Sequence, residues 1–196
     1  MEADFEALIK SFIETNIGIS TSFLSNSLAG HLRSNLLSLH QQNLMLPAGT
    51  GNANKLNHDL LTRSDVIYWL DRKHNNSYEN AFFDQVESFI HYLNKSCYTG
   101  ITDYEFHYSL YESGSFYIKH RDQFQDHSGR KYSMIFYLNA DWHKEDGGEL
   151  VIQQGLAQQS ISPVQGKTVF FKSNELIHEV LPTRQRRMSI TGWLKA

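Results

Sequence analysis

Two histidines and an aspartate have the types and spacing to bind one metal ion. His120 and Asp122 are separated by one residue after a predicted strand at residues 115–119, so an extended chain would point both side chains to one face. A third ligand must come from elsewhere, and His178 is the best candidate. Two imidazoles and one carboxylate are typical of the facial triad that binds non-haem iron(II) and leaves coordination positions open.

The segment that begins at Arg187 suggests a second chemical group. It reads R-M-S-I-T-G-W, and strand alternation places four of its residues on one face: Arg187, Ser189, Thr191 and Trp193. A guanidinium that faces a barrel interior needs an anion, because burying an unpaired charge is costly. A small dicarboxylate could meet Arg187 in a bidentate pair, and Tyr137 could offer its hydroxyl to the same carboxylate.

Helical patterns dominate the chain before residue 100. Apolar residues recur at spacings of three and four in residues 4–13, in a segment from Ser20 or Thr21 as N-cap to Leu37, and in residues 78–93. Residues 47–59 are rich in Gly and Asn and predict a mobile loop. A short strand is predicted at residues 65–70.

After residue 100 the pattern has period two and short runs. The predicted strands are residues 104–111, 115–119, 132–139, 149–153, 167–171 and 187–194, with turn residues between them. Many short strands without intervening helices favour an antiparallel barrel or jelly roll. We therefore expect a single domain at residues 1–196, with a largely helical support at 1–100 and a β core at 101–196.

Composition narrows the class of protein. Lys plus Arg number 18 and Asp plus Glu number 21, which gives a net charge of −3 and argues against binding to a nucleic-acid backbone. The single cysteine excludes an intramolecular disulfide framework and a Cys-rich zinc site. No apolar run reaches the roughly 18 residues of a membrane span, and the acidic start does not resemble a signal peptide, so we expect a cytoplasmic protein.

Several ordered motifs carry a resemblance to a known family. They are R-S-D-V-I-Y-W-L from Arg63, L-Y-E-S-G-S-F-Y-I-K-H-R-D from Leu110, I-F-Y-L-N from Ile135, D-W at Asp141, G-G-E-L-V-I from Gly147, V-F-F from Val169, H-E-V-L-P from His178 and the R-x-S-I-T-G-W ending. Together they cover roughly residues 60–196, and they resemble the Fe(II)/2-oxoglutarate-dependent dioxygenases of the prolyl 4-hydroxylase superfamily. The resemblance is closest to the hypoxia-inducible-factor prolyl hydroxylase branch.

The resemblance implies a fold and a set of site residues. The fold would be mainly β with N-terminal helices (α+β), a double-stranded β-helix or jelly roll supported by helices. Iron(II) would be bound by His120, Asp122 and His178. The distal carboxylate of 2-oxoglutarate would be held by Arg187 and Tyr137, with Thr191 and Tyr111 nearby. The residues that match positions along the substrate groove are Tyr117, Arg130, Trp193 and Arg63. The stretch from Tyr111 to His120 is one residue shorter than expected in the closest relatives.

The activity implied by the resemblance is hydroxylation of a prolyl residue in a protein or peptide. Decarboxylation of 2-oxoglutarate to succinate would be coupled to hydroxylation of a C–H bond, with O₂ as co-substrate and ascorbate as a further cofactor. The loop at residues 47–59 could close over the bound peptide. A monomer is expected.

Other functions remain open at this point. An oxidative demethylase of nucleic-acid bases uses the same triad, but the net charge of −3 and the R-x-S-I-T-G-W ending argue against it. A hydroxylase of free proline or another amino acid is a further alternative. A non-catalytic binding module for 2-oxoglutarate is disfavoured by the intact triad and Arg187. The other eight histidines are expected to be background, and His107 is expected to be a sheet or core residue.

Overall fold

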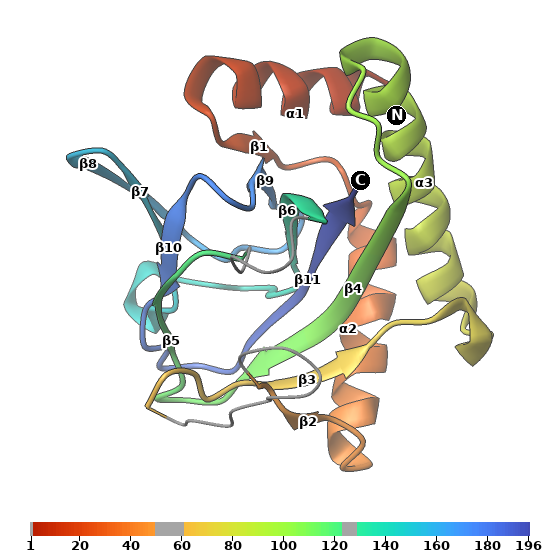
Figure 1. The fold of residues 1–196 in the computed structure, drawn as a ribbon. Coiled ribbons are helices and arrows are strands. Elements are labelled where there is room, and N and C mark those ends of the chain that lie inside the picture. The colour runs from red at the N-terminus through yellow and green to blue at the C-terminus, as the bar shows by residue number, and fades with distance from the viewer. Residues whose placement is uncertain (1, 50–60, 123–128) are drawn as a thin grey trace.

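A layer of helices covers one sheet of a two-sheet β structure in the computed structural model, which describes residues 2–49, 61–122 and 129–196 (Figure 1). The helices are α1 (Glu2–Thr15), α2 (Asn26–Gln41) and α3 (Ser77–Cys97), with short 3-10 helices η1 (Arg72–His74) and η2 (Lys144–Asp146). Most of the predicted loop at residues 47–59 lies outside the described residues. Among the described helices, none is long and apolar enough to cross a membrane.

The strands of the described ranges form a seven-stranded and a four-stranded antiparallel sheet. The larger sheet has the order β1-β9-β6-β11-β4-β3-β2 and the smaller one β5-β10-β7-β8. The strand bounds are β1 Gly18–Ser20, β2 Leu46–Pro47, β3 Val66–Trp69, β4 Asp103–Tyr111, β5 Tyr117–His120, β6 Arg130–Tyr137, β7 Leu150–Gln154, β8 Ala157–Ile161, β9 Thr168–Lys172, β10 Ile177–Val180 and β11 Arg187–Lys195. This arrangement confirms the predicted jelly roll with helical support.

The predicted start of the second helix was wrong. The helix begins at Asn26, because the Ser25 hydroxyl caps it by accepting the Leu28 N–H at 3.2 Å. The segment before it, Gly18–Ser20, instead forms β1 and pairs with β9. Four strands were not predicted: β1, β2, β8 and β10. Each is short, and β2 and β8 are largely exposed, so none carries a long alternating pattern.

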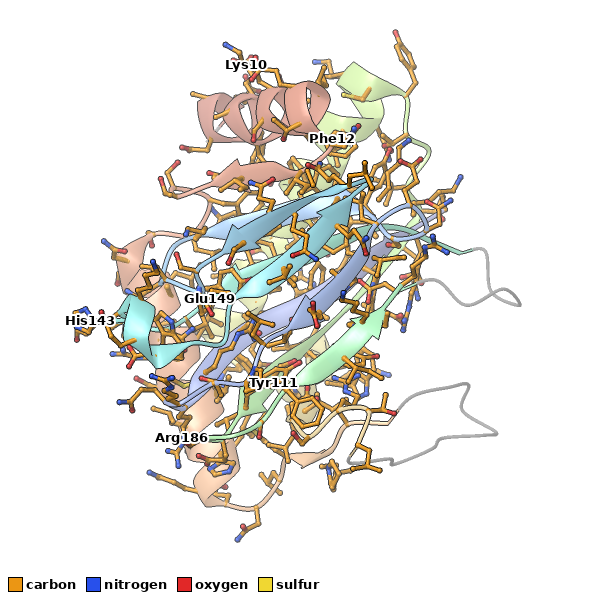
Figure 2. The ribbon with its side chains drawn as sticks, turned by 90° about the vertical axis from the view of Figure 1, so that its left-hand side faces the viewer. Lys10, Phe12, Tyr111, His143, Glu149 and Arg186 are labelled. Atoms are coloured by element: carbon orange, nitrogen blue, oxygen red, sulfur yellow. The ribbon has the colours of Figure 1, made fainter. Side chains whose placement is uncertain are left out.

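Two apolar cores hold the layers together. The helices pack on the outer face of the larger sheet; Phe12, for example, points from α1 toward it and meets the ring of Phe170 at 5.1 Å, while Lys10 points away (Figure 2). A second cluster lies between the sheets and includes Ile135, Leu150 and Phe171. The central strands β4, β6, β9 and β11 of the larger sheet therefore have one face toward the helices and one toward the smaller sheet.

Strand β11 shows the alternation predicted from its sequence. Met188, Ile190 and Leu194 belong to the core beneath the helices. Arg187 and Thr191 face the opposite side, where they line a pocket between the two sheets. The same strand thus contributes both to the core and to the candidate site.

Candidate functional site

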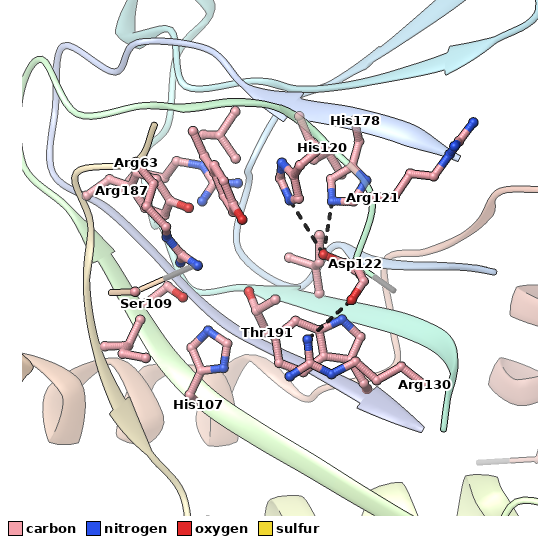
Figure 3. A pocket seen from close by; sticks show the side chains of 18 of the residues that line it. Arg63, His107, Ser109, His120, Arg121, Asp122, Arg130, His178, Arg187 and Thr191 are labelled. Carbon is pink, nitrogen blue, oxygen red and sulfur yellow. Dashed lines mark hydrogen bonds and ion pairs between the residues drawn. The ribbon is translucent and has the colours of Figure 1, made fainter. Parts of the chain in front are cut away.

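The three candidate metal ligands meet at one point of the pocket (Figure 3). His120 on β5 and His178 on β10 are direct register partners, and their ring centroids lie 4.2 Å apart. Asp122 follows β5, and its Oδ1 lies 3.5 Å from the Nε2 atom of each histidine. The ligand atoms of all three side chains lie within 4.8 Å of one another. The two 3.5 Å separations fit a metal about 2.1 Å from each donor, because two such donors lie at most about 4.2 Å apart.

Backbone carbonyls orient both imidazole rings. The Nδ1–H of His120 donates to the carbonyl of Ile118 at 2.8 Å, and that of His178 donates to the carbonyl of Leu176 at 3.3 Å. A proton on Nδ1 leaves the lone pair of Nε2 free, which is the tautomer a metal ligand needs. Both free nitrogens lie toward Asp122.

Ser133 of β6 fixes the carboxylate of Asp122. Its hydroxyl donates to Asp122 Oδ2 at 2.6 Å and lies 2.9 Å from the hydroxyl of Ser173. Oδ1 stays directed at the histidines. The hydrogen bond from Ser133 to Asp122 thus links the segment after β5 of the smaller sheet to β6 of the larger sheet.

The electrostatics of the cluster favour one cation. Burial alone would raise the pKa of Asp122, but the adjacent His178 and His120 hold it well below its usual value. Burial and the neighbouring His178 lower the pKa of His120. Burial also acts to lower the pKa of His178, but Asp122 outweighs it and the pKa is raised. A buried carboxylate thus stays ionised and favours a positive charge beside it, which a proton on His178 or a bound metal cation can supply.

Arg187 occupies the pocket wall away from the triad and has no counter-ion among the described residues. It is 2% exposed, and its Nε donates to the carbonyl of Gly148 at 2.8 Å. The rings of Tyr111 and Tyr137 lie 5.0 and 5.1 Å from its guanidinium carbon. Among the described residues, no carboxylate lies within ion-pair distance of it, and the buried hydroxyl of Tyr137 has no hydrogen-bond partner. A carboxylate from outside the chain would satisfy both groups.

Two other arginines of the pocket are already paired. Arg63 makes a bidentate contact with the buried Asp65, with both N···O distances 2.7 Å. Arg130 pairs with Glu105 at 2.7 Å and lies 3.5 Å over the ring of Trp193. Of these three guanidinium groups, the one on Arg187 is therefore the one available for an anion.

An aromatic stack supports the metal end. Tyr117 lies flat on the ring of His120, with ring centroids 3.5 Å apart and planes inclined by 14°. Arg63 lies on the ring of Tyr117, 4.3 Å from its centroid. Because the ion pair with Asp65 holds Arg63 in place, the stack of Arg63 and Tyr117 restricts the orientation of the His120 ring.

Most residues predicted for the site lie on the pocket wall. The pocket has a volume of about 170 Å³, and its lining includes Arg63, Tyr111, Tyr117, His120, Asp122, Arg130, His178, Arg187, Thr191 and Trp193. Tyr137 instead lies next to Arg187, outside that lining. Tyr111 lines the pocket despite the shorter segment that follows it.

The sequence reasoning missed several residues of the site. Ser133, Trp69, His107 and Ser109 were not proposed for it. His107 is buried in β4, which agrees with its predicted core position, but it also lines the pocket. Strand alternation could have found it, because His107, Ser109 and Tyr111 share one face of β4.

Known proteins share this sequence pattern and this fold. A sequence model of the 2OG-Fe(II) oxygenase superfamily matches residues 106–195. The crystal structure of a Pseudomonas putida prolyl-4-hydroxylase is 27% identical, with a TM-score of 0.89 over 98% of this chain and 99% of that one. A Trichoplax adhaerens prolyl hydroxylase, in complex with a hypoxia-inducible-factor peptide fragment, is 24% identical with a TM-score of 0.86, over 99% of this chain and 90% of that one.

A curated prolyl 3-hydroxylase of Xenopus laevis is 33% identical in a 76-residue match, and the match is given as covering 33% of this chain. The chain spans only 15% of the length of that relative. The matched range 106–195 contains the three candidate metal ligands and Arg187. The donor set, the guanidinium without a partner among the described residues and these similarities agree: the chain is similar to the 2OG-Fe(II) oxygenase superfamily in sequence over residues 106–195, and to a prolyl-4-hydroxylase in fold over 98% of its length.

Proposed function

We propose that the chain is a protein prolyl 4-hydroxylase. In the overall reaction, 2-oxoglutarate, O₂ and a prolyl C–H bond give succinate, CO₂ and a hydroxyprolyl residue. One observation carries the proposal: a single pocket combines three converging metal donors with a buried guanidinium that has no acidic partner among the described residues. These features match the two ends of a 2-oxo dicarboxylate, whose oxo acid end chelates a metal and whose other end is a free carboxylate.

In this proposal His120, Asp122 and His178 hold iron(II), and Arg187 with the hydroxyl of Tyr137 holds the distal carboxylate of 2-oxoglutarate. The iron supplies the activation of O₂ and the C–H chemistry when it is bound. The protein's own residues fix the geometry. The backbone carbonyls orient the two imidazoles, and Ser133 directs one oxygen of Asp122 toward them.

The residues around the pocket mouth would receive the substrate. Arg130 and Trp193 of the larger sheet form a cation–π pair on one side, and Arg63 forms another with Tyr117 of β5 in the smaller sheet. Because each pair is already fixed, these surfaces offer rigid, largely apolar faces on which a prolyl ring can pack. We place Tyr111 and Thr191 beside the co-substrate in the same pocket.

The partner in this proposal is a peptide segment of another protein. The Trichoplax relative was crystallised with a peptide fragment, which supports this class of substrate. The exposed basic residues offer little support for a nucleic-acid partner, since Arg186 pairs with Glu112 at 2.8 Å and the net charge is −3. The proposal also takes residues 1–196 as one cytoplasmic catalytic domain that acts as a monomer, with ascorbate as reductant.

Mass spectrometry of the host proteome tests this function. Cells that produce the wild-type protein are compared with cells that produce His120→Ala, and His91→Ala on the exposed side of α3 serves as a matched histidine control. We expect one added oxygen on a specific prolyl residue in the wild type and in His91→Ala, and none in His120→Ala. Acid hydrolysis and chromatography against 3- and 4-hydroxyproline standards identify the position of the hydroxyl group.

Three results would overturn the proposal. A nucleobase that loses a methyl group would identify a demethylase. Hydroxylation of free proline without any modified protein would identify an amino-acid hydroxylase. No iron(II)-dependent conversion of 2-oxoglutarate to succinate in any sample would exclude the enzyme class.

A further inference from the structure

His107 lies in the floor of the pocket between its two functional ends. On the larger sheet it is the direct register partner of Trp69 on β3 and of Thr191 on β11, and all three line the pocket. Along β11, Arg187 lies four residues before Thr191, which is roughly 13 Å of strand. Ser133, which holds the metal ligand Asp122, pairs with the residue two positions after Thr191. The row that contains His107 therefore lies between the dicarboxylate end and the metal end.

The ring of His107 is held firmly by its neighbours. Its centroid lies 4.9 Å from that of Trp69 and 5.5 Å from that of Trp193. His107 is 3% exposed, whereas Trp69 at the rim of the pocket is 47% exposed. The imidazole is therefore fixed deep in the pocket, where a small co-substrate reaches more readily than a peptide does.

Neither ring nitrogen of His107 makes a hydrogen bond to the part of the chain that the structure describes. Its Nδ1 is buried and makes no hydrogen bond. Nε2 makes no hydrogen bond in the described part of the chain and is not fully buried, and because His107 lines the pocket we infer that this nitrogen faces it. Burial, assisted by the charges of Arg63 and Arg130, lowers the pKa of His107 to about 3. The ring is consequently neutral and offers one N–H and one lone pair.

A buried neutral imidazole with no hydrogen-bond partner among the described residues calls for an explanation, as do the guanidinium of Arg187 and the hydroxyl of Tyr137 in the same site. In the tautomer with the proton on Nε2, the buried Nδ1 is an acceptor without a donor, and the Nε2–H is a hydrogen-bond donor that points into the pocket. The donor lies in the row beside the metal end, away from the carboxylate site of Arg187. The oxo acid end of a bound 2-oxo acid carries the negative charge and oxygen atoms that such a donor would contact.

We propose that His107 is a positioning residue for the co-substrate, whose Nε2–H donates a hydrogen bond to the oxo acid end of 2-oxoglutarate. This inference rests on the proposed function, because it takes 2-oxoglutarate as the occupant of the pocket. It adds a contact at the end opposite to the one that Arg187 binds. It also gives His107 a role separate from metal ligation.

Three substitutions at one position test the contact. His107→Gln carries an amide nitrogen near the place of Nε2, His107→Asn carries one near the place of Nδ1, and His107→Leu carries none. The ligands are 2-oxoglutarate and 2-oxopentanoate, which has the same oxo acid end and no distal carboxylate. Binding to the Mn(II)-loaded protein is measured by calorimetry without oxygen, so no turnover is needed.

We expect His107→Leu and His107→Asn to weaken both ligands by a similar factor of roughly 10 to 100, the effect of a lost hydrogen bond to a charged group. His107→Gln should restore most of this affinity. Arg187→Met should weaken 2-oxoglutarate strongly and 2-oxopentanoate little, which separates the two ends of the site. Mn(II) affinity and the Tm of the metal-free protein should stay close to wild type in His107→Gln and His107→Asn.

The outcomes separate this inference from the proposed function. If the wild type binds 2-oxoglutarate and His107→Leu binds it equally well, the contact does not exist but the function stands. Loss confined to the KM of the protein substrate would assign His107 to substrate binding and overturn the inference. If the wild type does not bind 2-oxoglutarate, both fail. If His107→Leu does not fold, equal affinities of the Gln and Asn variants would refute the contact.

Discussion

Replacing Ser133 with alanine tests whether the metal site depends on a hydrogen bond from the larger sheet. The Ser133 side chain is 0% exposed, and its hydroxyl donates to Asp122 Oδ2 at 2.6 Å. Asp122 is 8% exposed and directs its other oxygen, Oδ1, at the two histidines. Without the serine hydroxyl, Oδ2 has no fixed donor, and the carboxylate can rotate away from the metal position.

The size of the effect follows from the charge and the burial. A hydrogen bond to a charged group contributes about 1.5–3 kcal/mol, which corresponds to roughly 10- to 150-fold in an equilibrium constant. Removing an outer partner of a metal ligand typically costs roughly 10- to 100-fold in metal affinity. The two ranges agree, so we expect Ser133→Ala to weaken Mn(II) or Co(II) binding by about 1.5–3 kcal/mol.

The assay is competition for the metal against a chelator of known affinity, with wild type and variant side by side. Ser173→Ala is the matched control, because Ser173 contacts the hydroxyl of Ser133 at 2.9 Å but has no hydrogen bond to Asp122. The control should lose at most a few-fold in affinity. Unchanged affinity in Ser133→Ala, or an equal loss in Ser173→Ala, would refute the idea that this single bond orients the carboxylate.

Three further substitutions test other parts of the structure. Burial raises the pKa of Glu79, so ionisation of this side chain destabilises the folded state as the pH rises above the ordinary pKa of glutamate. Urea unfolding should therefore show that Glu79→Gln is more stable than wild type at pH 7 and that the difference vanishes in acid. A difference that stays constant with pH would contradict this. A Cβ at Gly192 would lie 2.2 Å from the carbonyl oxygen of Glu105. Overpacking typically costs ~1–3 kcal/mol, and this contact is severe, so Gly192→Ala should lose roughly 3 kcal/mol of unfolding free energy. A loss of less than about 1 kcal/mol would show that the two strands separate easily. Arg63→Met leaves the buried carboxylate of Asp65 unpaired and should cost about 3–5 kcal/mol, whereas the double variant Arg63→Met, Asp65→Asn should recover much of the loss in the same assay.

The sequence was sufficient to predict which side chains form the candidate metal site, but not the residues that support them. His120 and Asp122 stand two residues apart at a strand end, and Arg187 begins a strand with clear alternation, so local patterns revealed them. Ser133 lies in a strand of mostly apolar residues, and its role depends on a contact between two sheets. No local pattern encodes such a contact.

The same limit explains the errors in the fold. Strand β10 has four residues, and it exists because β5 and β7 lie on either side of it rather than because of its own composition. The segment before α2 contains the buried residues Phe23 and Leu24, which extended the apparent helical pattern in the sequence. In the structure these two side chains pack into the core from a non-helical segment, and the cap at Ser25 determines where the helix begins.

The two ends of the pocket belong to different sheets, so the length of co-substrate that fits depends on how the core packs between the sheets. His120 and His178 lie on the smaller sheet, while Arg187 lies on the larger one. The distance between the metal position and the guanidinium is therefore set by the apolar side chains that separate the sheets, such as Ile135 and Leu150, which also line the pocket. Because protein cores are close-packed and deform little, we expect this spacing to favour a dicarboxylate of fixed length, in addition to the polar contacts inside the pocket.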